Sequence, residues 1–169
     1  YFVDDPMDPI DLFIGAEGTL GILTEVELAL RPLPTALVAL IFLPDDDVAV
    51  ALTHTLRERS RATRGGARPE GLAVRSIEYF DARCLELIRS EGKLEDLRVV
   101  VPPGAGAALL VVHELPAGSD DSAVLAQLDS AFAGTPSGPV ADLVDALMAH
   151  DALDNTELAL PEQSRRQAQ

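Results

Sequence analysis

The sequence lacks long apolar runs, paired cysteines and an excess of basic residues. No uninterrupted apolar stretch is long enough to cross a bilayer, so we predict no membrane span. The one cysteine, Cys84, has no partner for an internal disulfide and no CxxC companion, which favours a reducing, cytoplasmic location. Thirteen basic residues against 28 acidic ones give a formal charge of −15. A surface this negative repels phosphate backbones and anionic lipid, so nucleic acid is not an expected partner.

Several catalytic signatures are also missing. No lysine follows the N-terminal glycines as a P-loop requires, and no GxSxG elbow is present for a hydrolase serine. His113 begins a match to the zinc-protease motif HExxH, but Ala117 stands where the second histidine should be. His54 and His150 are far from His113 in sequence, and a lone histidine is more often a surface or core residue than a ligand. We therefore predict no catalytic residue and no metal ligand in this chain.

What remains is the composition of a packed soluble protein, with 47% apolar and 24% charged residues over 169 positions. That length suits one domain, or one domain and part of a neighbour. The pattern of apolar residues changes at Pro32 and Pro34, from alternation before the prolines to a continuous run after them. We place a domain boundary there, between residues 1–34 and 35–169. Because the chain begins with Tyr1 and its last segment resembles the first turn of a helix, we interpret it as a fragment of a longer protein.

Around the prolines, two strands and a helix are predicted. Residues 20–30 alternate between apolar and polar side chains, which is typical of a half-buried strand, and residues 35–43 form an apolar run of strand length. Three aspartates at 45–47 follow. An acidic cluster can bind a hard cation, but at a helix N-terminus it caps free N–H groups, and we favour capping. The helix, predicted to end at Ser60 before a loop over 61–71, has apolar residues at Val48, Leu52 and Leu56.

The second half continues the alternation of strands and helices. A strand is predicted over 72–80, then a helix that begins at an N-cap, Asp81, and ends before Gly92. Within that helix we interpret Cys84 as a small packing residue and not as a nucleophile. A third strand follows a glycine-containing turn in 102–115.

Two further helices and a short strand complete the pattern. The helix over 119–132 is predicted to bury one stripe, formed by Val124, Leu125, Leu128 and Phe132. The helix over 140–150 is predicted to bury Val140, Leu143, Val144 and Leu147. A fourth strand is predicted at 156–160. This duplicated βαβ order predicts an α+β fold, a ferredoxin-like open antiparallel sheet with helices on one face.

Three glycines recur at every third position near the start of the chain, Gly15, Gly18 and Gly21. That spacing removes side chains from one side of a turn, so that an anionic or planar ligand can lie against backbone N–H groups. The other interpretation is a tight connection in which the glycines only permit positive φ. The spacing alone leaves both interpretations open.

The residues around the glycines, DLFIGAEGTLGILTEVELALRPLP preceded by YFVDDPMDPI, closely resemble the signature that ends the FAD-binding domain of FAD-linked oxidases, the vanillyl-alcohol oxidase and p-cresol methylhydroxylase family. The resemblance is strongest to the branch with the glycolate oxidase flavin subunit, D-lactate dehydrogenases and D-2-hydroxyglutarate dehydrogenases. That branch carries Glu-Gly-Thr-Leu-Gly-Ile followed by Thr-Glu, here Glu17 to Ile22, then Thr24 and Glu25. Ala16 stands where the family more often has serine. Beyond residue 34, SIEYFDARCLELIR and, more weakly, TELALPEQSRRQAQ resemble the cap domain.

The resemblance implies that residues 1–34 are the C-terminal end of an FAD-binding domain and that residues 35–169 are an incomplete cap, or substrate, domain. It also implies that the glycine segment contacts FAD, with a role in binding and not in chemistry. The implied cofactor residues are Glu17, Gly18, Thr19, Leu20, Gly21, Ile22 and Leu23. The family's pyrophosphate loop and its substrate-handling Arg and His residues have no counterpart in this chain. We therefore predict that the chain alone binds FAD weakly or not at all and turns over no substrate.

By the same resemblance, the parent protein is expected to be an FAD-dependent oxidoreductase acting on CH–OH groups. Its substrate would be a 2-hydroxy acid of the glycolate, D-lactate or D-2-hydroxyglutarate type, oxidised to the 2-oxo acid. These residues do not specify the electron acceptor, and a homodimer stays open as an assembly. Two alternatives remain: alkyl-glycerone-phosphate synthase chemistry on the same flavin scaffold, and a ferredoxin-like ligand-binding or assembly module without flavin.

Overall fold

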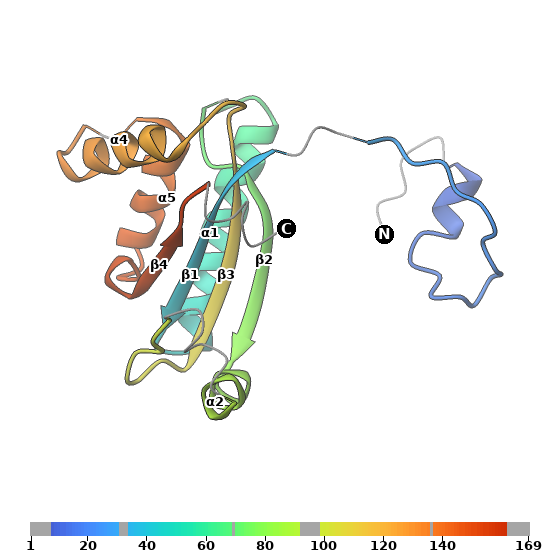
Figure 1. The fold of residues 1–169 in the computed structure, drawn as a ribbon, viewed down its shortest axis with the longest axis horizontal. Coiled ribbons are helices and arrows are strands. Elements are labelled where there is room, and N and C mark those ends of the chain that lie inside the picture. Colours follow the sequence, from blue (N-terminus) through green and yellow to red (C-terminus); the bar gives the residue numbers. More distant parts are fainter. Residues whose placement is uncertain (1–7, 31–33, 69, 92–98, 136, 162–169) are drawn as a thin grey trace. The chain divides into compact units, whose positions relative to one another are not determined.

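The computed structural model describes residues 8–30, 34–68, 70–91, 99–135 and 137–161 (Figure 1). The chain divides into two compact units. We call Tyr1–Pro32 the N-terminal unit and Leu33–Gln169 the sheet unit.

The sheet unit contains a four-stranded antiparallel sheet. Its strands are β1 (Thr35–Leu43), β2 (Val74–Asp81), β3 (Ala107–Leu115) and β4 (Thr156–Ala159). Their spatial order is β2-β3-β1-β4, and each neighbouring pair is antiparallel. Helix α1 (Asp46–Arg64) connects β1 to β2, while α4 (Asp121–Phe132) and α5 (Gly138–Met148) connect β3 to β4. Each connection joins two strands that have a third strand between them, which is the ferredoxin-like arrangement. The predicted fold class is therefore confirmed.

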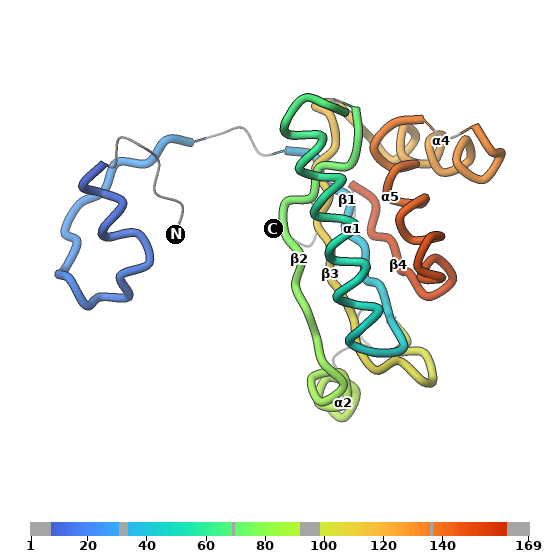
Figure 2. The backbone as a smooth tube through the Cα atoms, turned by 180° about the vertical axis from the view of Figure 1, so that it is seen from behind, coloured from blue at the N-terminus to red at the C-terminus, as the bar shows by residue number. Residues whose placement is uncertain are grey.

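The main core lies between one face of the sheet and the helices. On β1, Leu37, Ala39 and Ile41 alternate with less buried residues, and all three are at most 1% exposed. They pack with Leu52 and Leu56 of α1, which are fully buried. Helix α1 lies behind the sheet in Figure 1 and in front of it in Figure 2. The buried side chains, which recur every two residues on β1 and every four residues on α1, thus form a single core.

A smaller cluster lies on the opposite face of the sheet, at one end. Phe42 of β1 and Ala108 of β3 are buried there against Leu85 of α2 (Ala82–Ser90). Val99 and Val101, which precede β3, pack against the same cluster. Helix α2 therefore covers only the end of this face where β1 finishes and β3 begins.

Several helix boundaries differ from prediction by a few residues, and α1 and α5 show the physical reasons. Helix α1 continues to Arg64 instead of ending at Ser60. Its last turn is bonded to β2: Ser60 Oγ accepts the Val74 N–H at 3.0 Å, and Arg64 donates to the Val74 carbonyl. Helix α5 begins at Gly138, with proline in its first turn, instead of at residue 140.

The strand predicted over residues 20–30 is absent from the structure. Residues 21–30 have no regular secondary structure, and none of them belongs to a ladder of the described chain. The alternating side chains stay outside: Ile22 is 93% exposed and Leu30 is 88% exposed. A strand is stable only when a neighbour accepts its backbone hydrogen bonds, and the described residues supply no such neighbour.

Two predicted packing roles are also wrong. Cys84 is exposed, because Leu85 is the residue that α2 turns toward the sheet. In α4, Val124 is buried and Leu128 packs against the main core, but Leu125 is 49% exposed and Phe132 is 64% exposed. Helix α4 packs on α5 through a narrower stripe than the apolar pattern suggested. Gly92 and most of the last segment, 162–169, lie outside the described residues.

Candidate functional site

The predicted cofactor residues follow a short capped helix and lie in and just after a turn. Helix η1 (Pro9–Leu12) starts with a reciprocal cap, in which Asp8 Oδ1 accepts the Ile10 N–H at 3.0 Å. The chain then turns through 13–19, where the Thr19 N–H and hydroxyl both donate to the Ala16 carbonyl, at 2.9 and 2.6 Å. All seven predicted residues, 17–23, are exposed.

The three glycines of this turn have different conformational needs. Gly15 and Gly18 have φ of 77° and 78°, in the left-handed region that favours glycine. Gly21 does not have a positive φ, and a Cβ added to it would meet nothing within 4 Å. Positive φ therefore explains glycine at two of the three positions. Neither its conformation nor packing against the described residues explains glycine at Gly21.

The chemistry of the described N-terminal residues is apolar and acidic. Residues 8–30 contain no lysine or arginine. Leu20 is 59% exposed and Leu23 is 67% exposed, and Glu17 is the only ionisable side chain in the turn. This surface suits a flat apolar group next to bare backbone. It offers no cation to balance a phosphate.

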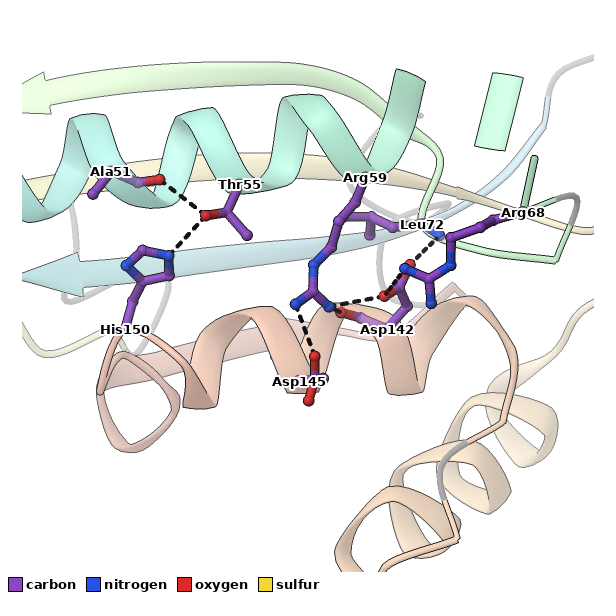
Figure 3. Close-up of polar contacts among 8 residues, drawn as sticks. All are labelled: Ala51, Thr55, Arg59, Arg68, Leu72, Asp142, Asp145 and His150. Atoms are coloured by element: carbon purple, nitrogen blue, oxygen red, sulfur yellow. Dashed lines mark hydrogen bonds and ion pairs between the residues drawn. The ribbon is translucent and has the colours of Figure 1, made fainter. Parts of the chain in front are cut away.

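The three histidines lie in different environments and do not form a site. His54 is exposed on α1, and His150 Nε2 lies 2.9 Å from the Thr55 hydroxyl. The Thr55 hydroxyl lies within hydrogen-bond distance of both His150 Nε2 and the Ala51 carbonyl oxygen, which is 3.2 Å away (Figure 3). Within the ranges that the structure describes, no group of three or more His, Cys, Asp or Glu residues could hold a metal ion. Of the aspartates at 45–47, Asp45 caps α1 as predicted, since its Oδ1 accepts the Val48 N–H at 2.9 Å, and the other two lie in the first turn of the helix.

His113 is fully buried on the side of the sheet that faces the helices. Its Nδ1 lies 3.0 Å from the carbonyl oxygen and 3.2 Å from the amide nitrogen of Ala73. Its Nε2 is buried and has no hydrogen-bond partner among the described residues. Burial lowers the pKa of His113 from 6.5, so the neutral ring is favoured in the folded state. The incomplete HExxH match therefore marks a core residue.

A charged cluster around Asp142 connects α1, the residues before β2, and α5 (Figure 3). The Asp142 side chain is only 5% exposed. Its Oδ1 accepts from Arg59 at 2.8 Å and from Arg68 at 3.2 Å, and its Oδ2 accepts the Leu72 N–H at 2.9 Å. Arg59 also pairs with Asp145 at 2.8 Å. The carboxylate is thus compensated on both oxygens, as a buried charge requires.

Sequence reasoning missed this cluster, although one signal was available. Asp142 interrupts the apolar stripe of VADLVDALM, and an aspartate among buried positions needs a cationic partner. A cavity of about 560 Å³ lies beside it, lined by residues that include Arg68, Glu70 and Ser137. Because Asp142 is already satisfied by Arg59, Arg68 and Leu72, we assign it a structural role.

The exposed nucleophiles near α2 are not activated. The Asp81 carboxylate, which caps α2 by accepting the Cys84 N–H at 2.7 Å, raises the pKa of the Cys84 thiol through a hydrogen bond. A raised pKa lowers the thiolate fraction, so Cys84 is a poor nucleophile. Tyr79 donates to Asp46 at 2.6 Å, and this bond raises the pKa of Tyr79 to about 12.

No helix in the described ranges is both long and apolar enough to cross a membrane. Within the described residues, the structure leaves the exposed segment 17–23, where the sequence predicts a cofactor, and the compensated charge cluster around Asp142 in the sheet unit. Comparisons with protein-family models, with curated proteins and with solved structures found no match to this chain.

Proposed function

We propose that this chain is part of an FAD-dependent oxidoreductase that converts a 2-hydroxy acid into the corresponding 2-oxo acid. The resemblance of residues 1–34 to FAD-linked oxidases supplies the reaction class. The observation that carries the proposal is Gly21. It is a glycine without positive φ, and no neighbour among the described residues would exclude a Cβ there. The choice of glycine at such a position is explained if a group from outside the chain approaches its backbone closely.

The exposed turn fits part of the cofactor. A Cβ added at Gly18 or Gly21 would meet no described atom within 4 Å, so the backbone has open space on that side at both positions. Leu20, Ile22 and Leu23 are exposed and can cover one side of an apolar ring. The absence of basic residues in 8–30 means that the diphosphate of the cofactor must be neutralised by groups elsewhere in the parent protein.

Each part of the turn then has a simple task. Gly15 and Gly18 set the backbone conformation, and the two bonds from Thr19 to the Ala16 carbonyl keep the turn closed. Gly21 permits close approach, and the adjacent leucine and isoleucine side chains exclude water from the cofactor. When bound, FAD accepts the hydride equivalent from the carbon that bears the substrate hydroxyl. Nothing in residues 17–23 acts on the substrate.

A substitution at Gly21 tests this proposal without disturbing the fold. In the intact parent protein, Gly21→Val should lower flavin content and weaken FAD binding at least about tenfold, because the new side chain occupies the space of the ligand. Gly18 is unsuitable, since its φ of 78° makes any substitution strained. The readout is visible flavin absorbance of the purified protein and titration of its apo form with FAD.

The matched control is Ala29→Val, which adds apolar bulk to the same exposed stretch outside residues 17–23. We expect Ala29→Val to keep its flavin. An intact parent that is colourless and does not bind added FAD would rule the proposal out. So would a Gly21→Val protein with unchanged flavin affinity.

A second candidate function is a ferredoxin-like ligand-binding or assembly module without flavin. The observation in its favour is that the sheet unit has its own core and a complete sheet of ferredoxin-like order. It predicts that residues 33–169, expressed alone, fold and unfold cooperatively. Thermal and urea unfolding of that segment measure this directly, and a segment that needs flavin to fold would contradict it.

A further inference from the structure

One face of the sheet is apolar, and the residues that the structure describes cover it only in part. Leu37, Ala39 and Ile41 point toward the helices, so the intervening residues of β1 point to the other side. Val38 and Leu40 of β1, with Leu110 and Val112 of β3, are half-buried there. Val38, Leu110 and Val112 belong to neither apolar cluster. Helix α2 and residues 99–105 cover only the end of the face near Phe42.

The strand register arranges this face in rows. Residues that are directly opposite on antiparallel strands have side chains on the same face. One row across the four strands is Glu78, Leu110, Leu40 and Glu157. The next row is Ser76, Val112, Val38 and Ala159. The partly covered face therefore has four apolar side chains on its two central strands and, in these two rows, one glutamate on each edge strand. The following row adds Glu114 of β3, which lies opposite Ala36 and 4.0 Å from Arg75 of β2.

The two glutamates have a defined separation. Neighbouring strands are about 4.8 Å apart, so Glu78 and Glu157, three strand intervals apart, are separated by about 14 Å. Both are exposed. An α-helix with its side chains is about 10–12 Å wide, which fits the space above the central strands between them. Lysine or arginine on each flank of such a helix would reach the carboxylates.

We propose that this face docks a basic amphipathic helix of another protein. The apolar stripe of the helix would lie along β1 and β3, over Leu40 and Leu110. Its flanking cations would pair with Glu78 on one side and Glu157 on the other. The sheet would then be covered by helices on both faces, as apolar sheet faces generally are in α and β proteins. This proposal does not depend on the presence of flavin.

Charge argues against the two obvious alternatives. A second copy of the chain would bring its own Glu78 and Glu157 near the same residues, and the chain already has a formal charge of −15. An anionic ligand, such as a hydroxy acid, would lose its hydration next to the two carboxylates, and the cation near them, Arg75, already lies beside Glu114. A cationic helix gains from the same two groups.

The test uses the full chain and two synthetic helical peptides. Both peptides carry the same leucine stripe, with lysine on both flanks in one and glutamate on both flanks in the other. We expect the lysine peptide to bind and the glutamate peptide not to bind, by fluorescence anisotropy. Amide chemical shifts should change along Val38–Leu40 and Leu110–Val112 and not in α4.

The double variant Glu78→Lys/Glu157→Lys should reverse this preference and weaken lysine-peptide binding about tenfold or more. Its matched control is Glu58→Lys/Asp129→Lys, which makes the same charge change at exposed positions of α1 and α4. We expect the control to keep the original preference. A control that also reverses the preference would show non-specific attraction to an acidic protein and would overturn the proposal.

Three other results would overturn it. One is equal binding of the two peptides. Another is concentration-dependent dimerisation of the chain that the double variant removes, measured by sedimentation, because a second copy is then the occupant. The third is lysine-peptide binding only after truncation at Pro161, because the chain's own Arg165 and Arg166 are then the occupants.

Discussion

The N-terminal residues 8–30 and the sheet unit use similar apolar side chains with opposite results. Leu28 is 69% exposed, whereas Leu52 is fully buried. Both belong to clear periodic patterns, of period two for Leu28 and of period four for Leu52. The difference is that Leu52 has a sheet to pack against, while the segment around Leu28 has no strand partner in the described chain. An amphipathic pattern therefore specifies a face, and a core forms only where a second layer meets it.

The sharpest test of this comparison is the same substitution in both regions. Leu52→Ala should lower the free energy of unfolding of the sheet unit by about 3 kcal/mol, through lost burial and a residual cavity. Leu28→Ala should change it by less than about 0.5 kcal/mol, because the side chain is already in solvent. Urea unfolding followed by circular dichroism measures both. A large loss for Leu28→Ala would mean that residues 20–30 contribute to the core of the sheet unit.

A second pair contrasts buried and exposed charge within the sheet unit. Asp142→Asn should cost about 2 kcal/mol, because it removes the charge that Arg59 and Arg68 share. Asp145→Asn removes a carboxylate whose side chain is 68% exposed and should cost less than about 0.5 kcal/mol. The same unfolding experiment applies. Equal losses in the free energy of unfolding would show that the contribution of Asp142 does not depend on its burial.

Glycines give a third comparison between the two regions. A Cβ on Gly106 would overlap the carbonyl oxygen of Pro44, whereas a Cβ on Gly21 would meet nothing, and neither glycine has a positive φ. Gly106→Ala should therefore destabilise the sheet unit by about 1–2 kcal/mol. Gly21→Ala should leave its melting temperature unchanged. A matching loss for Gly21→Ala would mean that the chain itself packs on Gly21, and this would remove the main support for a cofactor there.

The smallest expected effect is a pH dependence that belongs to the sheet unit alone. Burial lowers the pKa of His113 from 6.5, so the unfolded chain binds a proton at a pH where the folded chain does not. Stability contributed by the neutral ring is therefore complete above pH 6.5 and decreases as pH falls below it. The slope of unfolding free energy against pH should flatten in His113→Leu and persist in His54→Gln. An NMR titration in which His113 protonates at the pH of an unfolded peptide would contradict this.

Much of the fold was predictable because its signals are local. The apolar run of β1, the repeat at Val48, Leu52 and Leu56, and the caps at Asp45 and Asp81 all depend on residues close in sequence. The ferredoxin-like order followed from the succession of these elements. The buried side of α5 was also predicted, with Val140, Leu143, Val144 and Leu147 all buried.

The errors and omissions share one cause, which is dependence on distant residues. The pattern of residues 20–30 could not reveal that the described chain lacks a strand beside it. Cys84 and Phe132 have typical core side chains, but neighbouring elements pack on other sides of their helices. Asp142 becomes a structural residue only because Arg59 and Leu72, far away in sequence, reach it.

The sequence by itself determined which faces of the strands and helices are apolar, because side-chain periodicity is a property of neighbouring residues. It also determined the spacing of Gly15, Gly18 and Gly21 at every third position. Only the tertiary structure decided the strand register that aligns Glu78, Leu110, Leu40 and Glu157, and the burial of Asp142. These depend on pairing between segments separated by many residues, and such pairing exists only once the sheet has formed.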